Sequence, residues 1–130
     1  MIKLKTGEQY LDEEGRLHIK FNIPDKNEEF RYADAKEHIE ASLSLCEGIA
    51  RPFIIDGNDA NLNMTPEACK LLATDSSLNS VRLAEAFITD SLAVNLMFQY
   101  HIRLRKSPPN SKIFKNNTEA EEWLNDIVAK

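Results

Sequence analysis

The chain has 130 residues, of which 42% are hydrophobic and 28% charged, and it carries a formal net charge of -5 at pH 7. A chain of this length and composition can fold as one domain, residues 1–130, and bury a core without disulfides or a metal ion. The acidic balance argues against binding to nucleic-acid phosphates, and the lack of a long apolar run or a signal-peptide core argues against membrane insertion, so we expect a cytoplasmic protein.

The first part of the chain has the pattern of β-strands. Residues 2–4 and 9–11 are short strand candidates, and the polar turn at residues 12–15 ends in a glycine, which accepts a positive φ. Apolar and polar side chains then alternate from residue 17 to residue 23, which predicts a strand with one buried face. We therefore expect an N-terminal hairpin.

Helix and strand patterns alternate through the middle of the chain. Asp34, with a glutamate three residues later, resembles a capping box, and apolar residues at helical spacing continue to residue 48. The apolar run Phe53-Ile54-Ile55 predicts a central strand covered on both faces. Thr65, followed by a proline, predicts the N-cap of the next helix, and this helix is expected to end in the polar stretch of residues 74–79.

The last part of the chain continues this alternation. We predict a strand over residues 81–89, a helix over residues 91–105 capped by the threonine or the aspartate before it, a short strand over residues 112–115, and a helix that begins after Asn116. The expected fold is α/β, with an N-terminal hairpin followed by alternating strands and helices. Its sheet would be mostly parallel and packed with about four helices.

An acidic, asparagine-rich loop follows the predicted central strand, and Asp56 and Asp59 are its carboxylates. A calcium loop requires oxygen ligands at alternating positions and a closing glutamate. A register that begins at Asp56 places Ala60 at a ligand position, and one that begins at Asp59 places Lys70 at the closing position. We therefore expect no metal here and interpret both aspartates as candidate interaction residues.

The remaining motifs do not predict an enzyme. The three histidines fall on different predicted elements, the two cysteines are too far apart for a CxxC site, and the chain lacks a glycine-rich phosphate loop and a nucleophile elbow. We expect no catalytic residues, no metal and no cofactor.

Glu85 is unusual because it lies in the middle of a predicted strand. A buried carboxylate is costly unless it is paired or protonated. Two interpretations remain open: the side chain faces a pocket, has a raised pKa and is functional, or it lies at a sheet edge or pairs with a cross-strand lysine or arginine.

The predicted helix over residues 91–105 has a narrow polar stripe, and apolar residues wrap more than half of its circumference. One sheet face does not need so wide an apolar surface. A neighbouring helix, a second subunit or an apolar ligand could cover the rest. The candidate surface residues are Leu96, Met97, Phe98 and Tyr100.

Several stretches together resemble the uncharacterised bacterial proteins of the STAS/SpoIIAA-like superfamily: residues 14–20, 34–39, 51–56, 64–68 and 112–124. The resemblance implies a sheet packed with helices, related to the anti-sigma-factor antagonists and more distantly to the CRAL-TRIO lipid carriers. In the antagonists, a phosphorylatable serine or threonine begins the helix after the central strand, within an Asp-Ser-Ser/Thr-Gly pattern. This chain has Asn-Met-Thr-Pro there, so only Thr65 corresponds to that residue.

Thr65 therefore has two interpretations, a helix cap and a phosphorylation site, because a phosphate also suits a helix N-terminus. The function that we predict is a non-enzymatic cytoplasmic interaction or regulatory module, whose partner is another protein or a second copy of the chain. The alternative is a carrier or sensor of a small apolar ligand or lipid held between the apolar helix and the sheet.

Overall fold

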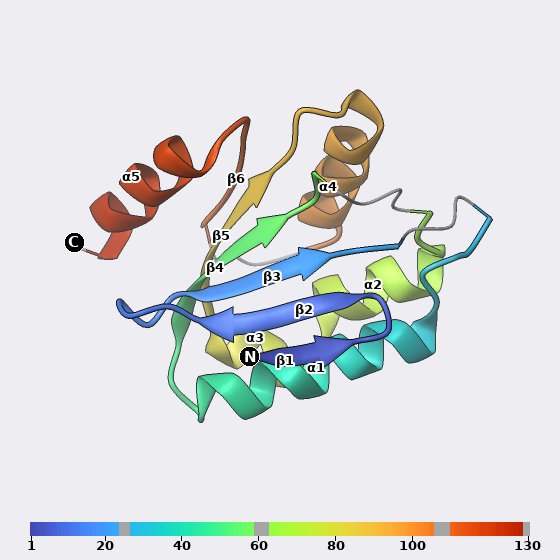
Figure 1. Ribbon diagram of the computed structural model, residues 1–130, viewed down its shortest axis with the longest axis horizontal. Helices are drawn as coiled ribbons and strands as arrows, with labels where there is room; N and C mark the ends of the chain where they lie inside the picture. The colour runs from blue at the N-terminus through green and yellow to red at the C-terminus, as the bar shows by residue number, and fades with distance from the viewer. Residues whose placement is uncertain (24–26, 59–62, 106–109, 129–130) are drawn as a thin grey trace.

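The structure, a computed structural model, describes residues 1–23, 27–58, 63–105 and 110–128. In these residues the chain forms six strands and five helices (Figure 1). The strands are β1 (Ile2–Leu4), β2 (Gly7–Leu11), β3 (Leu17–Phe21), β4 (Arg51–Asp56), β5 (Arg82–Ile88) and β6 (Asn110–Phe114). The helices are α1 (Tyr32–Cys46), α2 (Pro66–Thr74), α3 (Ser76–Val81), α4 (Leu92–Leu104) and α5 (Asn117–Val128).

All six strands belong to one sheet, in which their spatial order follows their order in the chain. β1, β2 and β3 pair antiparallel, whereas β3, β4, β5 and β6 are parallel. The expected hairpin and the mostly parallel α/β sheet are therefore confirmed.

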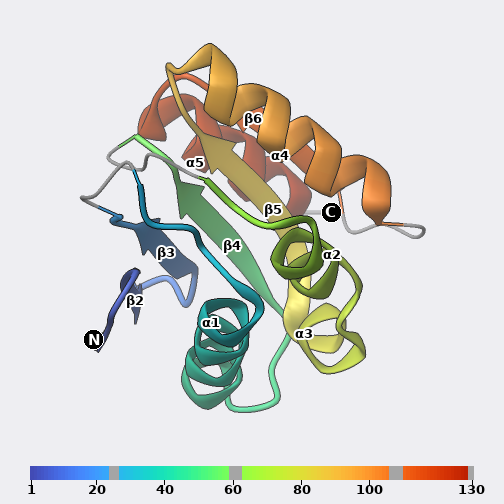
Figure 2. The same cartoon turned by 90° about the vertical axis from the view of Figure 1, so that its right-hand side faces the viewer.

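Every parallel connection steps in the same direction along the sheet. α1 connects β3 to β4, α2 and α3 connect β4 to β5, and α4 connects β5 to β6. Crossovers of one hand that advance in one direction place their helices on the same face. In Figure 2, α1, α2 and α3 lie together on one side of the strands, and residues of α4 join the same core.

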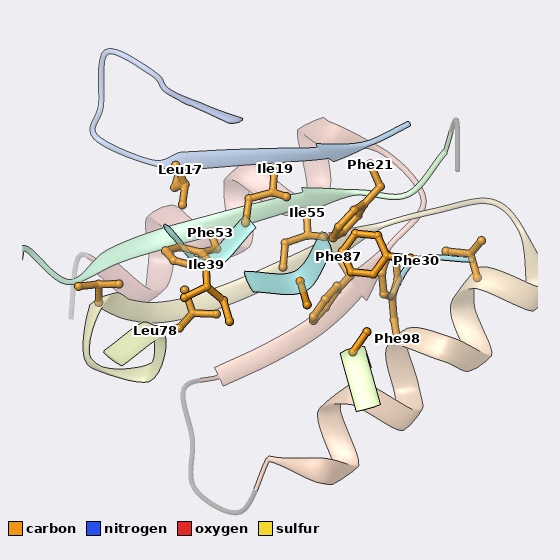
Figure 3. Close-up of a cluster of buried hydrophobic side chains, with 14 of the residues drawn as sticks. Leu17, Ile19, Phe21, Phe30, Ile39, Phe53, Ile55, Leu78, Phe87 and Phe98 are labelled. Atoms are coloured by element: carbon orange, nitrogen blue, oxygen red, sulfur yellow. The ribbon is translucent and has the colours of Figure 1, made fainter. Parts of the chain in front are cut away.

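The larger core lies between this face and the four crossover helices. Strand β3 contributes alternate residues to it, as the sequence pattern predicts, and all of them are buried. Figure 3 shows the side chains from both strands and helices meeting in this layer. Those labelled there are Leu17, Ile19, Phe21, Phe30, Ile39, Phe53, Ile55, Leu78, Phe87 and Phe98.

The opposite face is covered only in part, because α5 packs on β4, β5 and β6. Figure 1 shows β2 and β3 unobstructed by any helix on this side. The central position predicted for Phe53-Ile54-Ile55 is confirmed, since Phe53 and Ile55 join the larger core and Ile54 joins the smaller one. The smaller core consists of Ile54, Ala84, Ala86, Ile88, Phe114, Ala120 and Leu124.

Two predicted helix starts are wrong by a few residues. α1 begins before Asp34, whose Oδ2 accepts a hydrogen bond of 2.9 Å from the backbone N–H of Arg31, so this aspartate lies in the first turn and is not the cap. The cap of α4 is Ser91, whose Oγ accepts from the Val94 N–H at 3.4 Å. At α1 the aspartate is at the third helical position and reaches back to the cap, whereas three consecutive short polar residues precede α4 and each could have capped it.

The polar stretch of residues 74–79 was expected to end the helix, but most of it belongs to a second short helix, α3. The Asp75 side chain caps this helix by accepting from the Leu78 N–H at 2.9 Å. Leu78 and Val81 are buried, so packing of two apolar residues stabilises a segment whose other residues are polar.

Candidate functional site

The predicted loop residues lie at the ends of β4 and α2. The Asp56 Oδ1 atom accepts a hydrogen bond of 2.9 Å from the Asn58 N–H, which forms an Asx turn after β4. The Thr65 hydroxyl accepts from the Ala68 N–H at 3.2 Å, so its prediction as the N-cap of α2 is confirmed. Asp59 lies outside the described residues. The regulatory or interaction roles of Asp56, Asp59 and Thr65 stay predictions.

Asp56 also lines a groove of about 250 Å³ on the partly covered face, between β2, β3 and the start of α5. Its lining includes Glu8, Lys20 and Asp56, which are neighbours across three strands and alternate in charge. Such opposite charges on adjacent strands stabilise a sheet surface without a ligand. Among the described residues, no group of three or more His, Cys, Asp or Glu side chains could hold a metal ion.

The candidate residues of α4 divide between its two sides. Leu96 is 53% exposed and Tyr100 is 45% exposed, whereas Met97 is half-buried. Phe98 is 4% exposed, so its prediction as a surface residue is wrong. Its ring packs 4.5 Å from that of Phe87, because the side of α4 that carries it faces the sheet.

The exposed side of α4 also includes Leu92, which is 76% exposed and was not among the predicted residues. Leu92, Leu96 and Tyr100 are spaced four residues apart, so they form one stripe along the helix. We call these three residues the α4 stripe. Within the described residues, the neighbouring helices leave this stripe uncovered.

Gly57 explains how closely α4 approaches the sheet. A Cβ atom at this position would lie 2.8 Å from the Phe98 ring and 2.9 Å from the Val94 side chain. A side chain at this position would therefore force Phe98 and Val94 to shift. This close contact fixes which side of α4 is buried and which side carries the stripe.

A buried polar cluster lies between β5 and α4. Glu85 is fully buried, and its Oε2 atom accepts hydrogen bonds from Arg82 Nη1 at 3.0 Å and from His101 Nε2 at 3.2 Å. Its Oε1 atom accepts from Ser111 Oγ at 3.0 Å and from Arg105 Nη1. We call Arg82, Glu85, His101, Arg105 and Ser111 the Glu85 cluster.

A β-bulge makes this cluster possible. The register between β4 and β5 shifts at Leu83, which has no partner on β4 while the residues on either side of it do. In a regular strand, residues three apart point to opposite faces, so Arg82 and Glu85 could not meet. The bulged residue turns outward and is 43% exposed, and Arg82 then lies on the same face as Glu85.

The partners of Glu85 determine its charge. Burial by itself raises the pKa of this carboxyl, but the hydrogen bond and charge of His101 and the charges of Arg82 and Arg105 outweigh burial and hold the pKa at about 2. Burial lowers the pKa of Arg82 to about 10, so its guanidinium is still charged at neutral pH. Glu85 is therefore paired, and the raised pKa is wrong, but its arginine partners lie on its own strand and after α4 and not on a neighbouring strand as expected.

A second buried polar cluster links α1 to the N-terminal hairpin. Gln9 Nε2 donates to His38 Nδ1 at 3.1 Å and to the His38 carbonyl at 2.9 Å, and Ser42 Oγ donates to Gln9 Oε1 at 2.7 Å. The His38 Nε2–H group then donates to Thr6 Oγ1 at 3.0 Å. We call Thr6, Gln9, His38 and Ser42 the His38 cluster. Burial lowers the pKa of His38 to about 4, so its ring is neutral at neutral pH.

A small apolar cavity lies between the sheet and helices α1, α2 and α4, with His38, Ser42, Arg82 and His101 among its lining residues. Its volume is about 40 Å³. A cavity of about 150 Å³ is needed to hold a ring the size of benzene, whereas about 15 Å³ suffices for one water molecule. The cavity therefore has room for a small group and not for a lipid.

Sequence reasoning singled out Glu85 but not its partners. Arg82 is recognisable as a partner only once the bulge is known, and Arg105 is twenty residues away in the chain. The His38 cluster had a usable signal, since Ala35, His38 and Ser42 follow the spacing of one buried helix face. The interpretation of the three histidines as unrelated residues missed this spacing.

Comparisons with known proteins identify the fold. The sequence pattern of the DUF7793 family, described as a domain of unknown function, matches residues 9–128. Among solved structures, the chain is similar to an uncharacterised protein of the DUF3478 family from Shewanella loihica PV-4, which has a SpoIIAA-like fold. The two are 14% identical, the similarity covers 91% of each chain, and the TM-score is 0.58. No curated protein matches the chain.

This structural neighbour confirms the SpoIIAA-like resemblance as a statement about fold. At this level of identity, the likeness carries no activity or partner from one protein to the other. None of the helices in the described residues is long and apolar enough to cross a membrane.

Proposed function

The chain belongs to the DUF7793 family, and we propose that it is a cytoplasmic protein-interaction module without catalytic activity, with the exposed side of α4 as its contact surface. The observation that carries the proposal is the α4 stripe, in which Leu92, Leu96 and Tyr100 are 76%, 53% and 45% exposed. Single exposed apolar residues are ordinary, but an apolar row along one helix is typical of a surface that another chain covers.

The packing of α4 against the sheet supports this role. Val94 and Phe98 pack against Gly57 on one side of the helix, and His101 is hydrogen-bonded to Glu85. A helix fixed in this way presents its outer residues without a large loss of conformational entropy on binding. The stripe therefore lies on a preorganised surface.

The chemistry of the buried carboxylate supports the non-enzymatic part of the proposal. Glu85 is ionised and receives hydrogen bonds from four side chains, so it has little capacity left to accept a substrate proton. His38 is neutral and has both ring nitrogens engaged within its own cluster. A general base must reach the proton that it takes, and these groups are enclosed.

Site-specific photocrosslinking in cells that produce the protein tests this proposal. A photoreactive amino acid in place of Leu96 should form covalent adducts with a protein, whereas the same amino acid in place of Glu122, an exposed residue of α5, should not. The adducts should disappear when Leu92 and Tyr100 are also replaced by serine. Equal crosslinking from both positions, or none from either, would contradict the proposal.

The alternative, a carrier of a small apolar ligand, has weaker support because its cavity has a volume of only about 40 Å³. Three flexible side chains, Met64, Met97 and Leu72, line the cavity and would have to move for it to enlarge. Native mass spectrometry of protein purified from its own cells tests this alternative, since a retained ligand would add a defined mass.

A further inference from the structure

The two ends of the α4 stripe carry opposite charges. Asp90 is exposed just before the helix, and Arg103 is exposed in its last turn. Leu96 lies near the middle of the stripe, seven residues before Arg103 and six residues after Asp90. With a rise of about 1.5 Å per residue, Leu92 and Arg103 are about 6 Å and about 10 Å from Leu96 along the helix axis, and Asp90 lies two residues beyond Leu92, outside the helix.

This arrangement is complementary to itself. In a two-fold pair, a surface meets the same surface of the other copy, so residues before the centre meet residues after it. If two α4 helices cross antiparallel at Leu96, the start of each helix, which Asp90 precedes, lies beside the last turn of the other, which carries Arg103. The leucines at the centre would be covered by the same contact.

We propose that a second copy of this chain covers the α4 stripe, with the two α4 helices antiparallel and an Asp90–Arg103 ion pair at each end. The inference rests on the proposed function, since it names the partner for the same surface. A partner of unrelated sequence would also need an apolar centre flanked by opposite charges in this order. A second copy has that arrangement by symmetry.

The charges at the ends matter more for pairing than the charge of the whole molecule. Each copy has a formal net charge of -5, which opposes association. That repulsion is spread over the surface and is screened beyond about 8 Å at physiological salt, whereas the two ion pairs act at contact. The small apolar centre and the exposed ion pairs predict a weak dimer that forms as protein concentration rises.

Sedimentation velocity of the full chain over a concentration series tests the inference. The wild-type protein should shift from monomer to dimer, and Leu96→Glu should raise the dissociation constant by about tenfold or more, because the change occurs twice at the centre. Tyr32→Glu is the matched control, since Tyr32 is 50% exposed on α1, away from the stripe, and its replacement should leave the dimer unchanged.

A charge exchange makes the test specific for this geometry. Asp90→Arg places two arginines at each end of the pair, and Arg103→Asp places two aspartates there, so each variant alone should dimerise less than wild type. An equimolar mixture of the two variants should associate again. In the mixed pair, the two introduced side chains face each other at one end as an ion pair, and the unchanged Asp90 and Arg103 form the ion pair at the other end.

The mixture result separates pairing from misfolding, because a variant that failed to fold could not be rescued by another variant. Thermal melts by circular dichroism should show all four variants folded. Recovery in the mixture should also weaken at high salt, where the Debye length falls to about 3 Å.

A wild-type chain that stays monomeric at every concentration, or a mixture that associates no better than its components, would overturn the inference. Crosslinks from position 96 to a different protein would then leave the proposed function in place and reject the second copy as partner.

Discussion

The Glu85 cluster and the His38 cluster border the same small cavity, but they bury polar groups in different ways. The Glu85 cluster is ionic, with one carboxylate between two guanidinium groups, whereas the His38 cluster consists of neutral groups joined by hydrogen bonds. Loss of one ion from the first leaves a buried charge without compensation, and loss of one group from the second leaves an unmade hydrogen bond. The same fold therefore depends on the two clusters to different degrees.

The largest effect is expected from Glu85→Ala, which leaves Arg82 and Arg105 buried beside each other without their counter-ion. We expect the free energy of unfolding to fall by about 3–5 kcal/mol, as for other broken buried ion pairs. Urea unfolding followed by circular dichroism measures this. Replacement of Glu85, Arg82 and Arg105 together by apolar residues should cost less than Glu85→Ala alone, and a larger cost would show that shape, not charge, dominates the cluster.

Acid should weaken the His38 cluster before the Glu85 cluster. The pKa of His38 falls from 6.5 to about 4 on folding, so the unfolded chain binds more protons between these values and stability is lost as pH falls from about 6.5 to 4. The shift corresponds to about 3 kcal/mol. Glu85, with a folded pKa of about 2 against 4.5, contributes stability that is lost only as pH falls below about 4.5.

Urea unfolding at pH 7 and at pH 5 checks this order. His38→Gln keeps a neutral polar side chain but does not titrate, so the difference in stability between wild type and this variant should shrink at the lower pH. An unchanged difference would show that folding does not lower the pKa of His38.

Ser42→Ala tests a single hydrogen bond of the neutral cluster. It removes the donor to Gln9 Oε1 and leaves that buried acceptor unsatisfied. We expect a loss of about 1–3 kcal/mol, smaller than for Glu85→Ala. Ser44→Ala, at an exposed position on the same helix, is the control and should change thermal stability little.

Ser111→Ala should have the smallest effect, about 1 kcal/mol or less in thermal unfolding, because Glu85 Oε1 keeps its bond from Arg105. If the loss of stability were as large as that from Ser42→Ala, the hydrogen bond from Ser111 to the carboxylate would matter as much as the one from Ser42 to Gln9.

Much of the fold could be predicted from sequence because it depends on local patterns. The alternation along β3, the apolar run of β4 and the Thr65 cap each specify an element within a few residues. The errors were confined to short stretches: burial of Leu78 and Val81 stabilises α3 in a polar stretch, Asp34 lies at the third position of α1 and not at its cap, and competing polar side chains obscured the start of α4.

The candidate surfaces could be predicted only in part. An apolar helix was recognisable from its composition, but the side of it that faces solvent depends on how closely α4 approaches Gly57. This contact buries Phe98 and leaves Leu92, Leu96 and Tyr100 outside. A helical periodicity alone cannot separate two apolar sides of one helix.

The sequence by itself determined the α/β class, the order of the strands along the chain and the unusual position of Glu85, because periodicity, capping residues and residue type act over a few neighbours. Only the tertiary structure decided which groups meet Glu85 and which side of α4 is exposed. The bulge at Leu83 and the packing of α4 on the sheet bring together residues far apart in the chain. Such contacts depend on the positions of whole elements, which no local pattern encodes.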